Sequence, residues 1–304
     1  MKIAIPDLIS NSYFPVIAAV ELGLFKQEGL DVSLELVVPV ENALKGLGDS
    51  SLEFLGCSSH LVVGGFPEWR GAKLLCAQSQ HMYWFLVMRA DLKVERGDLA
   101  ALKGRRIGAA YWIAMTLKQL LAEKGIDAER EGINIAPIPG AHGAGMSFGV
   151  IAAQALADGR VDGFWANGMG AELAVRRGVG TVVLDARRDV GTPDYTMASI
   201  VAADRLIERS PETAAAAVRA IVKAQRALKG NPDLASDIGR RRFPETEAGV
   251  IADIVRRDLP YYDSSLPPAA IDRMIRFSNA AGILRRQPSY DEIVARQFAP
   301  LWTG

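Results

Sequence analysis

The order in which short apolar runs and helical patterns follow one another constrains the fold of this chain more than any other feature of its sequence. Near the N-terminus, strand-like runs alternate with helix-like segments. We predict strands at residues 2–5, 32–37, 52–55 and 72–77. We predict helices between them at residues 16–25, 43–47 and 61–66. Strands joined by helices in this order form βαβ units, which indicates a parallel sheet with helices on its faces.

The pattern starts again at Phe85 and gives a second set of strands and helices. These strands are predicted at residues 85–89, 106–109, 133–138, 161–165 and 181–184. The helices are predicted at residues 98–102, 112–124 and 171–177, and in a segment that ends at 157. An extended segment at 195–201 returns to the first set, and the remainder of the chain, from 211 to 302, is helical.

We therefore predict an α/β protein of two lobes, each a sheet flanked by helices, with a helical C-terminal region. Residues 1–84 and 196–304 are expected to form lobe I, and residues 85–195 lobe II. The chain is expected to cross between the lobes near 81–84 and 194–197. At 304 residues the chain is long enough for both lobes to have a core.

Composition and charge exclude several classes of partner. Lys and Arg together number 35, as do Asp and Glu, and no stretch combines basic residues with aromatic ones, so nucleic acid is not an expected partner. No apolar run is long enough for a membrane span. The chain opens on a strand rather than on an export signal, which predicts a cytoplasmic protein, or a periplasmic one if the sequence is a processed form. We expect a monomer that binds a small molecule.

The two cysteines, Cys57 and Cys76, lie in apolar surroundings and lack the spacing of metal ligands or of a disulfide framework. We predict two buried thiols, with no metal and no cofactor. Charged runs in the C-terminal region, such as Arg240–Arg242, are interleaved with acidic residues and are expected to be solvated faces.

Four segments resemble a known family. The run GLFKQEGLDV at Gly23–Val32 is similar to the signature of the nitrate/sulfonate/taurine class of ABC-importer solute-binding proteins. Leu102–Gly108, Ala155–Gly163 and Val201–Ile207 resemble further segments of that family, in the same order along the chain. The resemblance covers residues 1 to about 230, within the superfamily that also contains the thiamine-pyrimidine synthases.

The resemblance implies the type II periplasmic-binding fold, in which two lobes close on one ligand. It implies that loops at the carboxyl ends of strands and the N-termini of helices hold the ligand, and the free N–H groups of a helix start favour an anion. The expected function is capture of a small organic ligand, anionic and with an apolar or aromatic body, for delivery to an ABC permease. Two helix starts fit this role, at Ser10–Tyr13 and at Tyr111–Thr116.

The predicted ligand-binding residues are polar and aromatic side chains in strand-end loops and at helix starts. They are Ser10, Asn11, Tyr13, Phe14, Ser58, His60, His81, Tyr83, Tyr111, Trp112, Asn167 and Tyr195. Aromatic residues with a few polar groups suit a flat organic ligand. The competing interpretation is that the aromatic residues fill the cores of the lobes and that Asn167 belongs to an ordinary turn.

No catalytic residues are predicted, but two other functions stay open. One is a cytoplasmic decarboxylase or lyase on the same fold, in which His60 or His81 moves a proton; the Cys-rich motif of the thiamine-pyrimidine synthases is absent. The other is a cytoplasmic ligand sensor. The glycine-rich run Pro139–Gly145, which contains His142, lacks the ending of a phosphate-binding loop and is interpreted as a turn whose amides could touch the ligand.

Overall fold

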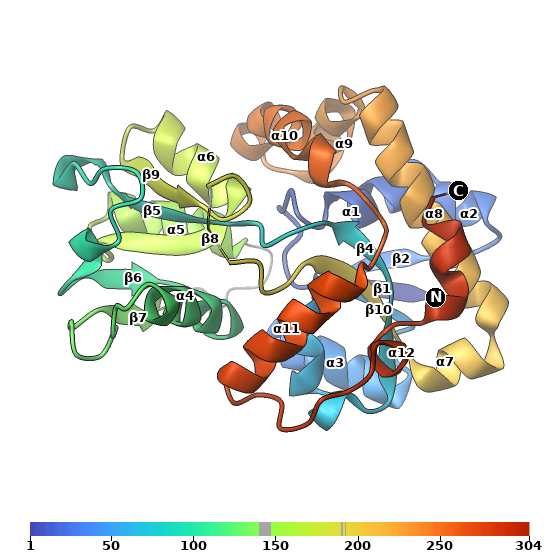
Figure 1. Cartoon of the computed structure of the whole chain (residues 1–304). Coiled ribbons are helices and arrows are strands. Elements are labelled where there is room, and N and C mark those ends of the chain that lie inside the picture. Colours follow the sequence, from blue (N-terminus) through green and yellow to red (C-terminus); the bar gives the residue numbers. More distant parts are fainter. Residues whose placement is uncertain (140–146, 190, 192, 304) are drawn as a thin grey trace. The chain divides into compact units, whose positions relative to one another are not determined.

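The computed structural model describes residues 1–139, 147–189, 191 and 193–303. The chain divides into two compact units, shown in Figure 1. Unit 1 contains Met1–His81 and Tyr195–Gly304, and unit 2 contains Met82–Asp194. The C-terminal helices, coloured orange to red in Figure 1, all belong to unit 1.

Unit 1 is built on a five-stranded sheet with the order β2-β1-β3-β10-β4. Its strands are β1 (Lys2–Ile5), β2 (Ser33–Leu36), β3 (Phe54–Ser58), β4 (Ala72–Ser79) and β10 (Ala198–Ala203). β1 pairs in parallel with β2 and β3, whereas β10 is antiparallel to both β3 and β4. The carboxyl ends of β1 to β4 and the amino end of β10 therefore meet at one edge, which we call the unit 1 ligand edge.

Helices flank this sheet. They are α1 (Phe14–Glu21), α2 (Leu24–Gln27), α3 (Val40–Asp49), α7 (Asp204–Arg209), α8 (Pro211–Gly230), α9 (Leu234–Arg242), α10 (Glu245–Asp258), α11 (Pro268–Ala280) and α12 (Tyr290–Ile293). Four 3₁₀ helices join them: η1 (Ser59–Gly64), η2 (Pro67–Trp69), η5 (Leu259–Tyr261) and η6 (Arg296–Leu301). The long helix α8 packs on α1 and α2, and Glu28 ties it there through ion pairs of 2.5 Å to Arg219 and 2.7 Å to Lys223.

Two predicted helices of this unit differ from the structure. The helix predicted at 16–25 is divided into α1 and α2, because Gly23 adopts a left-handed conformation (φ 68°) that a continuous helix does not contain. The helix predicted at 61–66 is the 3₁₀ helix η1, which starts directly after β3. His60 therefore lies on η1 rather than in a loop.

Unit 2 repeats the architecture with the strand order β7-β6-β8-β5-β9. Its strands are β5 (Trp84–Arg89), β6 (Arg106–Gly108), β7 (Asn134–Ala136), β8 (Gly163–Asn167) and β9 (Gly180–Asp185). Its helices are α4 (Tyr111–Glu123), α5 (Phe148–Ala157) and α6 (Gly168–Arg176), with the 3₁₀ turns η3 (Ala90–Leu92) and η4 (Ala100–Leu102). Because β5 is antiparallel to β8 and β9, its amino end joins the carboxyl ends of the other strands at one edge, the unit 2 ligand edge.

Each unit has an apolar core of its own. In unit 1 the fully buried side chains include Phe14, Phe25 and Phe54, and in unit 2 they include Phe164 and Trp165. The prediction of an α/β protein whose sheets are flanked by helices, with a helical C-terminal region, is confirmed.

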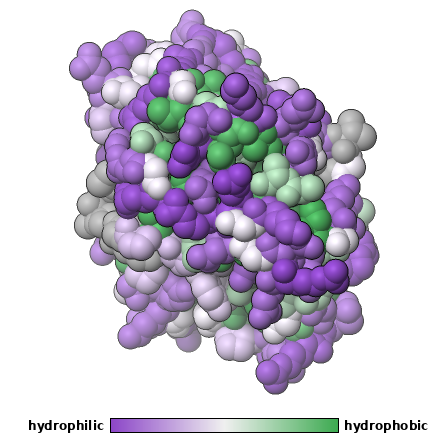
Figure 2. Space-filling model, turned by 90° about the vertical axis from the view of Figure 1, so that its left-hand side faces the viewer, coloured by the Kyte–Doolittle hydropathy of each residue, from purple (hydrophilic) through white to green (hydrophobic). Residues whose placement is uncertain are grey.

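The surface carries no broad apolar band on the side that Figure 2 shows, where hydrophobic residues are confined to limited areas of a mostly hydrophilic face. Among the residues that the structure describes, no helix is both long and apolar enough to cross a membrane.

Candidate functional site

The unit 1 ligand edge gathers polar residues that lie far apart in the sequence. Ser10 and Asn11 follow β1, and Ser58 and His60 lie at the end of β3 and the start of η1. The pairing of Ser58 with Ala198 brings the segment around Tyr195 to the same edge. The side chains of Ser10, Asn11, Ser58 and His60 are fully buried. Burial of so many polar groups at one strand edge is typical of a binding site or of an internal hydrogen-bond network.

His60 is held from two sides. Its ring nitrogen Nδ1 lies 3.1 Å from the hydroxyl of Thr196, whose oxygen also accepts a bond of 3.4 Å from the His60 backbone N–H. Its ring packs edge-on against Phe277 of α11, with the ring centres 5.5 Å apart, and Tyr195 stacks on the same phenylalanine at 4.8 Å. His60 and Tyr195 are therefore joined through Phe277, a residue that sequence reasoning did not select.

Two neighbouring candidates serve the packing of unit 1. Tyr13 occupies the position just before α1 and is buried. Phe14 begins that helix, is fully buried and meets Phe243 edge-on with ring centres 6.2 Å apart. His81 differs from both because it is exposed, has a left-handed backbone (φ 62°), and packs edge-on against Tyr261.

The unit 2 ligand edge gathers aromatic side chains, of which Tyr111 is exposed whereas Tyr83 and Trp84 are buried. Tyr111 begins α4 directly after β6, and with 62% of its surface exposed it is one of the few exposed large hydrophobic residues in the described chain. Its ring meets that of Trp112 edge-on at 5.7 Å. Tyr83 and Trp84 lie at the amino end of β5 with ring centres 4.9 Å apart. An exposed aromatic residue at a helix start is available to stack on a flat ligand.

Asn167 ends β8 and caps α6. Its side-chain oxygen accepts a bond of 3.2 Å from the backbone N–H of Gly170, so it satisfies a donor that the first turn of the helix leaves open. A Cβ atom at Gly149 would lie only 2.3 Å from that oxygen, which shows how closely α5 approaches the cap. This helix-capping role agrees with the interpretation of Asn167 as part of an ordinary turn. Because the capping bond fixes the side-chain oxygen, it also fixes the orientation of the amide nitrogen.

Arg187 places a positive charge at the unit 2 ligand edge, and sequence reasoning did not select it. It follows β9, and the pairing of Phe85 with Asp185 puts this loop beside the amino end of β5. The guanidinium lies over the ring of Tyr83, 5.7 Å from the ring centre. The signal that could have found it is its position three residues after a predicted strand end, because the same rule selected Ser58 and Asn167.

The glycine-rich run Pro139–Gly145 and His142 cannot be compared with their predicted role, because residues 140–146 lie outside the described residues. Among the residues that are described, no group of three or more His, Cys, Asp or Glu side chains could hold a metal ion.

Both cysteines are buried and free, as predicted. Burial raises the pKa of the Cys57 thiol to about 12 and also raises the pKa of Cys76.

We expect neither thiol to react with a thiol reagent at pH 8 in the native protein, because the reactive thiolate is scarcely populated and access is blocked. In a titration with dithiobis(nitrobenzoic acid), no thiol should react rapidly in buffer, whereas both thiols should react in guanidinium chloride. A fast native thiol would contradict the burial of these strands.

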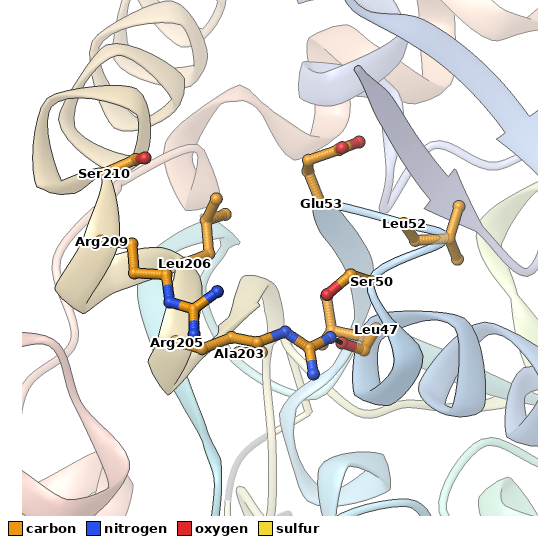
Figure 3. Close-up of a pocket in the computed structure, with 9 residues that line it drawn as sticks. All are labelled: Leu47, Ser50, Leu52, Glu53, Ala203, Arg205, Leu206, Arg209 and Ser210. Carbon is orange, nitrogen blue, oxygen red and sulfur yellow. Dashed lines mark hydrogen bonds between the residues drawn. The ribbon is translucent and has the colours of Figure 1, made fainter.

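A small pocket of about 160 Å³ lies at the opposite end of the unit 1 sheet, between α3, the start of β3, and α7 (Figure 3). Its arginine Arg205 donates bonds of 2.5 and 2.7 Å to the carbonyl oxygens of Gly48 and Leu47 near the end of α3. These bonds cap α3 and fasten α7 to it. No predicted ligand-binding residue lines this pocket, and its arginine already has a structural role.

The fold that these two units define is that of the type II periplasmic binding proteins, as solved structures confirm. A protein from Bordetella bronchiseptica RB50 has a TM-score of 0.78 and 20% identity, with 98% of this chain and 95% of that chain covered. The alkanesulfonate-binding protein SsuA from Xanthomonas axonopodis pv. citri, bound to MOPS, has a TM-score of 0.72 and 13% identity, covering 99% and 96%. At these identities the likeness establishes the fold.

The chain belongs to the NMT1/THI5-like family, whose model matches residues 10–235. This confirms the predicted superfamily. The fold also occurs in an enzyme: the desulfurization enzyme DszB, in complex with biphenyl-2-sulfinic acid, has a TM-score of 0.66 and 17% identity, covering 98% of this chain and 97% of that one. No curated protein sequence matches this chain.

Proposed function

We propose that this protein binds one small organic anion with an apolar or aromatic body and serves as the solute-binding component of an ABC importer. The observation that carries the proposal is the chemical character of the side chains that each unit gathers at its own ligand edge. The unit 1 edge supplies buried polar groups around His60, and the unit 2 edge supplies the exposed ring of Tyr111 and the charge of Arg187. Polar anchors, an aromatic surface and one cation are the groups that such a ligand requires.

The structural relatives support an anionic ligand. One relative is an alkanesulfonate-binding protein bound to MOPS, and another is an enzyme in complex with a biphenyl sulfinic acid. Both ligands combine a sulfur oxyanion with a larger organic body. We propose the same general class for this chain, with the predicted residues at each edge, other than the packing residues Tyr13 and Phe14, as ligand contacts.

Binding without chemistry is favoured over catalysis. A histidine that acts as a general base is usually oriented by a carboxylate, but the ring nitrogen Nδ1 of His60 meets the hydroxyl of Thr196. The buried thiols of Cys57 and Cys76 are poor nucleophiles because burial raises their pKa. Because an enzyme shares the fold, the fold alone does not decide between the two functions.

The proposed role also bears on location and partners. A solute-binding component acts on the outer side of the membrane, as a monomer that docks on a permease. A cytoplasmic location would instead favour the enzyme or sensor functions that the sequence leaves open.

A thermal-shift screen tests the proposal. The purified protein is heated with a panel of alkyl and aryl sulfonates, aromatic carboxylates and nitrate, with matched neutral amides and alcohols as controls. A ligand that binds only the folded state raises the melting temperature. We expect a shift with at least one organic anion and none with its neutral counterpart. Shifts with neutral compounds alone would contradict the anionic class.

A further inference from the structure

Two buried polar atoms in the loop after β1 have no hydrogen-bond partner among the described residues. They are the side-chain oxygen Oδ1 of Asn11 and the hydroxyl oxygen of Ser12. Both side chains are fully buried. Leaving a buried acceptor unpaired costs about 1–3 kcal/mol, so two adjacent residues of this kind at a ligand edge point to a group that is bound there.

The orientation of the Asn11 amide is fixed by Asp258 at the end of α10. The amide nitrogen Nδ2 of Asn11 donates to the carboxylate oxygen Oδ2 of Asp258. An ionised carboxylate only accepts hydrogen bonds, so the nitrogen must face Asp258 and the oxygen Oδ1 must face away. Arg257 favours the ionised form, because its Nε lies 3.7 Å from the other oxygen of Asp258.

The same segment also holds the backbone of Asn11. The hydroxyl of Tyr262, a buried residue after η5, donates a bond of 3.0 Å to the carbonyl oxygen of Asn11. Both bonds join residues more than 240 positions apart, at sequence separations of 247 and 251. Asn11 is therefore clamped at its side chain and at its backbone by one C-terminal segment.

The position of Asp258 is a costly one for a carboxylate. It is the last residue of α10, where the negative end of the helix dipole disfavours a carboxylate, and it is fully buried. Removing a charge from water is costly unless its hydrogen bonds are met. The bond to Asn11 helps to offset that cost, and it leaves the amide oxygen in one orientation.

We infer that Asp258 and Tyr262 are positioning residues, and that they hold Asn11 so that its amide oxygen accepts a hydrogen bond from the ligand. The inference rests on the proposed function and narrows its ligand class. The ligand carries an N–H or O–H donor in addition to its anionic group, and the hydroxyl of Ser12 serves the same polar end. Amino- and hydroxy-substituted sulfonates and carboxylates meet this description.

The test compares matched anions that differ only in the donor. The pairs are 4-aminobenzenesulfonate with benzenesulfonate, taurine with ethanesulfonate, and 4-hydroxybenzoate with benzoate, and dissociation constants are measured by calorimetry. For at least one pair, we expect the wild-type protein to bind the donor-bearing member about tenfold more tightly. The ratio within a pair is the readout, because loss of folded protein weakens both members equally.

Three variants test whether the clamp on Asn11 causes the difference in affinity between the two members of a pair. Asp258→Leu should bring it below about threefold, since the Asn11 amide is then free to turn. Tyr262→Phe keeps the ring and removes only the hydroxyl, so it tests the clamp even if Asp258→Leu fails to fold, and it should lower the ratio at least threefold. Asp263→Leu makes the same replacement at an exposed neighbouring position and should leave the ratio unchanged.

The outcomes separate the inference from the proposed function. Equal affinity within every pair that binds would overturn the inference while the anion-binding function stands. A ratio that survives both Asp258→Leu and Tyr262→Phe would overturn the positioning role. If no member of any pair binds, both the donor-bearing ligand class and the proposed anionic class are contradicted.

Discussion

Replacing Gly149 by valine is expected to lower the free energy of unfolding by about 3 kcal/mol or more and to weaken ligand binding as well. Any Cβ atom at this position would lie 2.3 Å from the Asn167 side-chain oxygen and 3.0 Å from the backbone nitrogen of Gly170. The helix pair α5 and α6 must then separate, and the cap that Asn167 provides is lost. Chemical denaturation followed by circular dichroism measures the effect.

A second glycine supplies the matched control. Gly249 lies on the exposed side of α10, and a Cβ atom there would meet nothing within 4 Å. Gly249→Ala should therefore stabilise the protein by about 0.5–1 kcal/mol, because alanine loses less backbone entropy in a helix. A Gly149→Val protein as stable as the wild type would show that α5 and α6 do not meet as described.

Replacing Tyr111 by alanine is expected to weaken binding of the organic anion at least tenfold while changing the free energy of unfolding by less than about 0.5 kcal/mol. The ring is 62% exposed at the start of α4, so the fold gains little from it. An aromatic ligand would lose a stacking surface, and such surfaces dominate binding energies. Calorimetry with the strongest anion from the thermal-shift screen measures the affinity.

Val175→Ala is the control for this variant, because Val175 is another exposed large hydrophobic residue, 46% exposed, and lies near the end of α6. It should alter neither affinity nor stability. Unchanged affinity in Tyr111→Ala would remove the start of α4 from the proposed ligand contacts. A large loss of stability would mean that the ring has a packing role.

The sequence predicted the architecture because apolar runs mark buried strands directly. β1 was predicted at its observed bounds, and most other strands lie within two residues of their predictions. β3 was placed too early, since the predicted strand at 52–55 stops before the residues that end β3. In the structure Cys57 and Ser58 continue the ladder by pairing with β10, and a single sequence carries no signal for a partner strand so distant.

The ligand edges could be predicted only in part. Ser58, Asn167 and Tyr111 follow from one rule, that side chains just after parallel strands gather at one edge. Phe277 and Asp258 do not, because they lie on C-terminal helices whose periodicity indicates which face is buried but not what it packs against. Arg187 was within reach of the rule and was overlooked.

The most direct test of the solute-binding function is to identify what the protein does to a bound anion. The protein is incubated overnight with the strongest anion from the screen, the complex is separated from free ligand, and the ligand is released by denaturation and identified by mass spectrometry. We expect one equivalent per chain with unchanged mass, as a solute-binding protein requires. Recovery of a desulfonated, decarboxylated or otherwise altered product would contradict the solute-binding function and identify the protein as an enzyme.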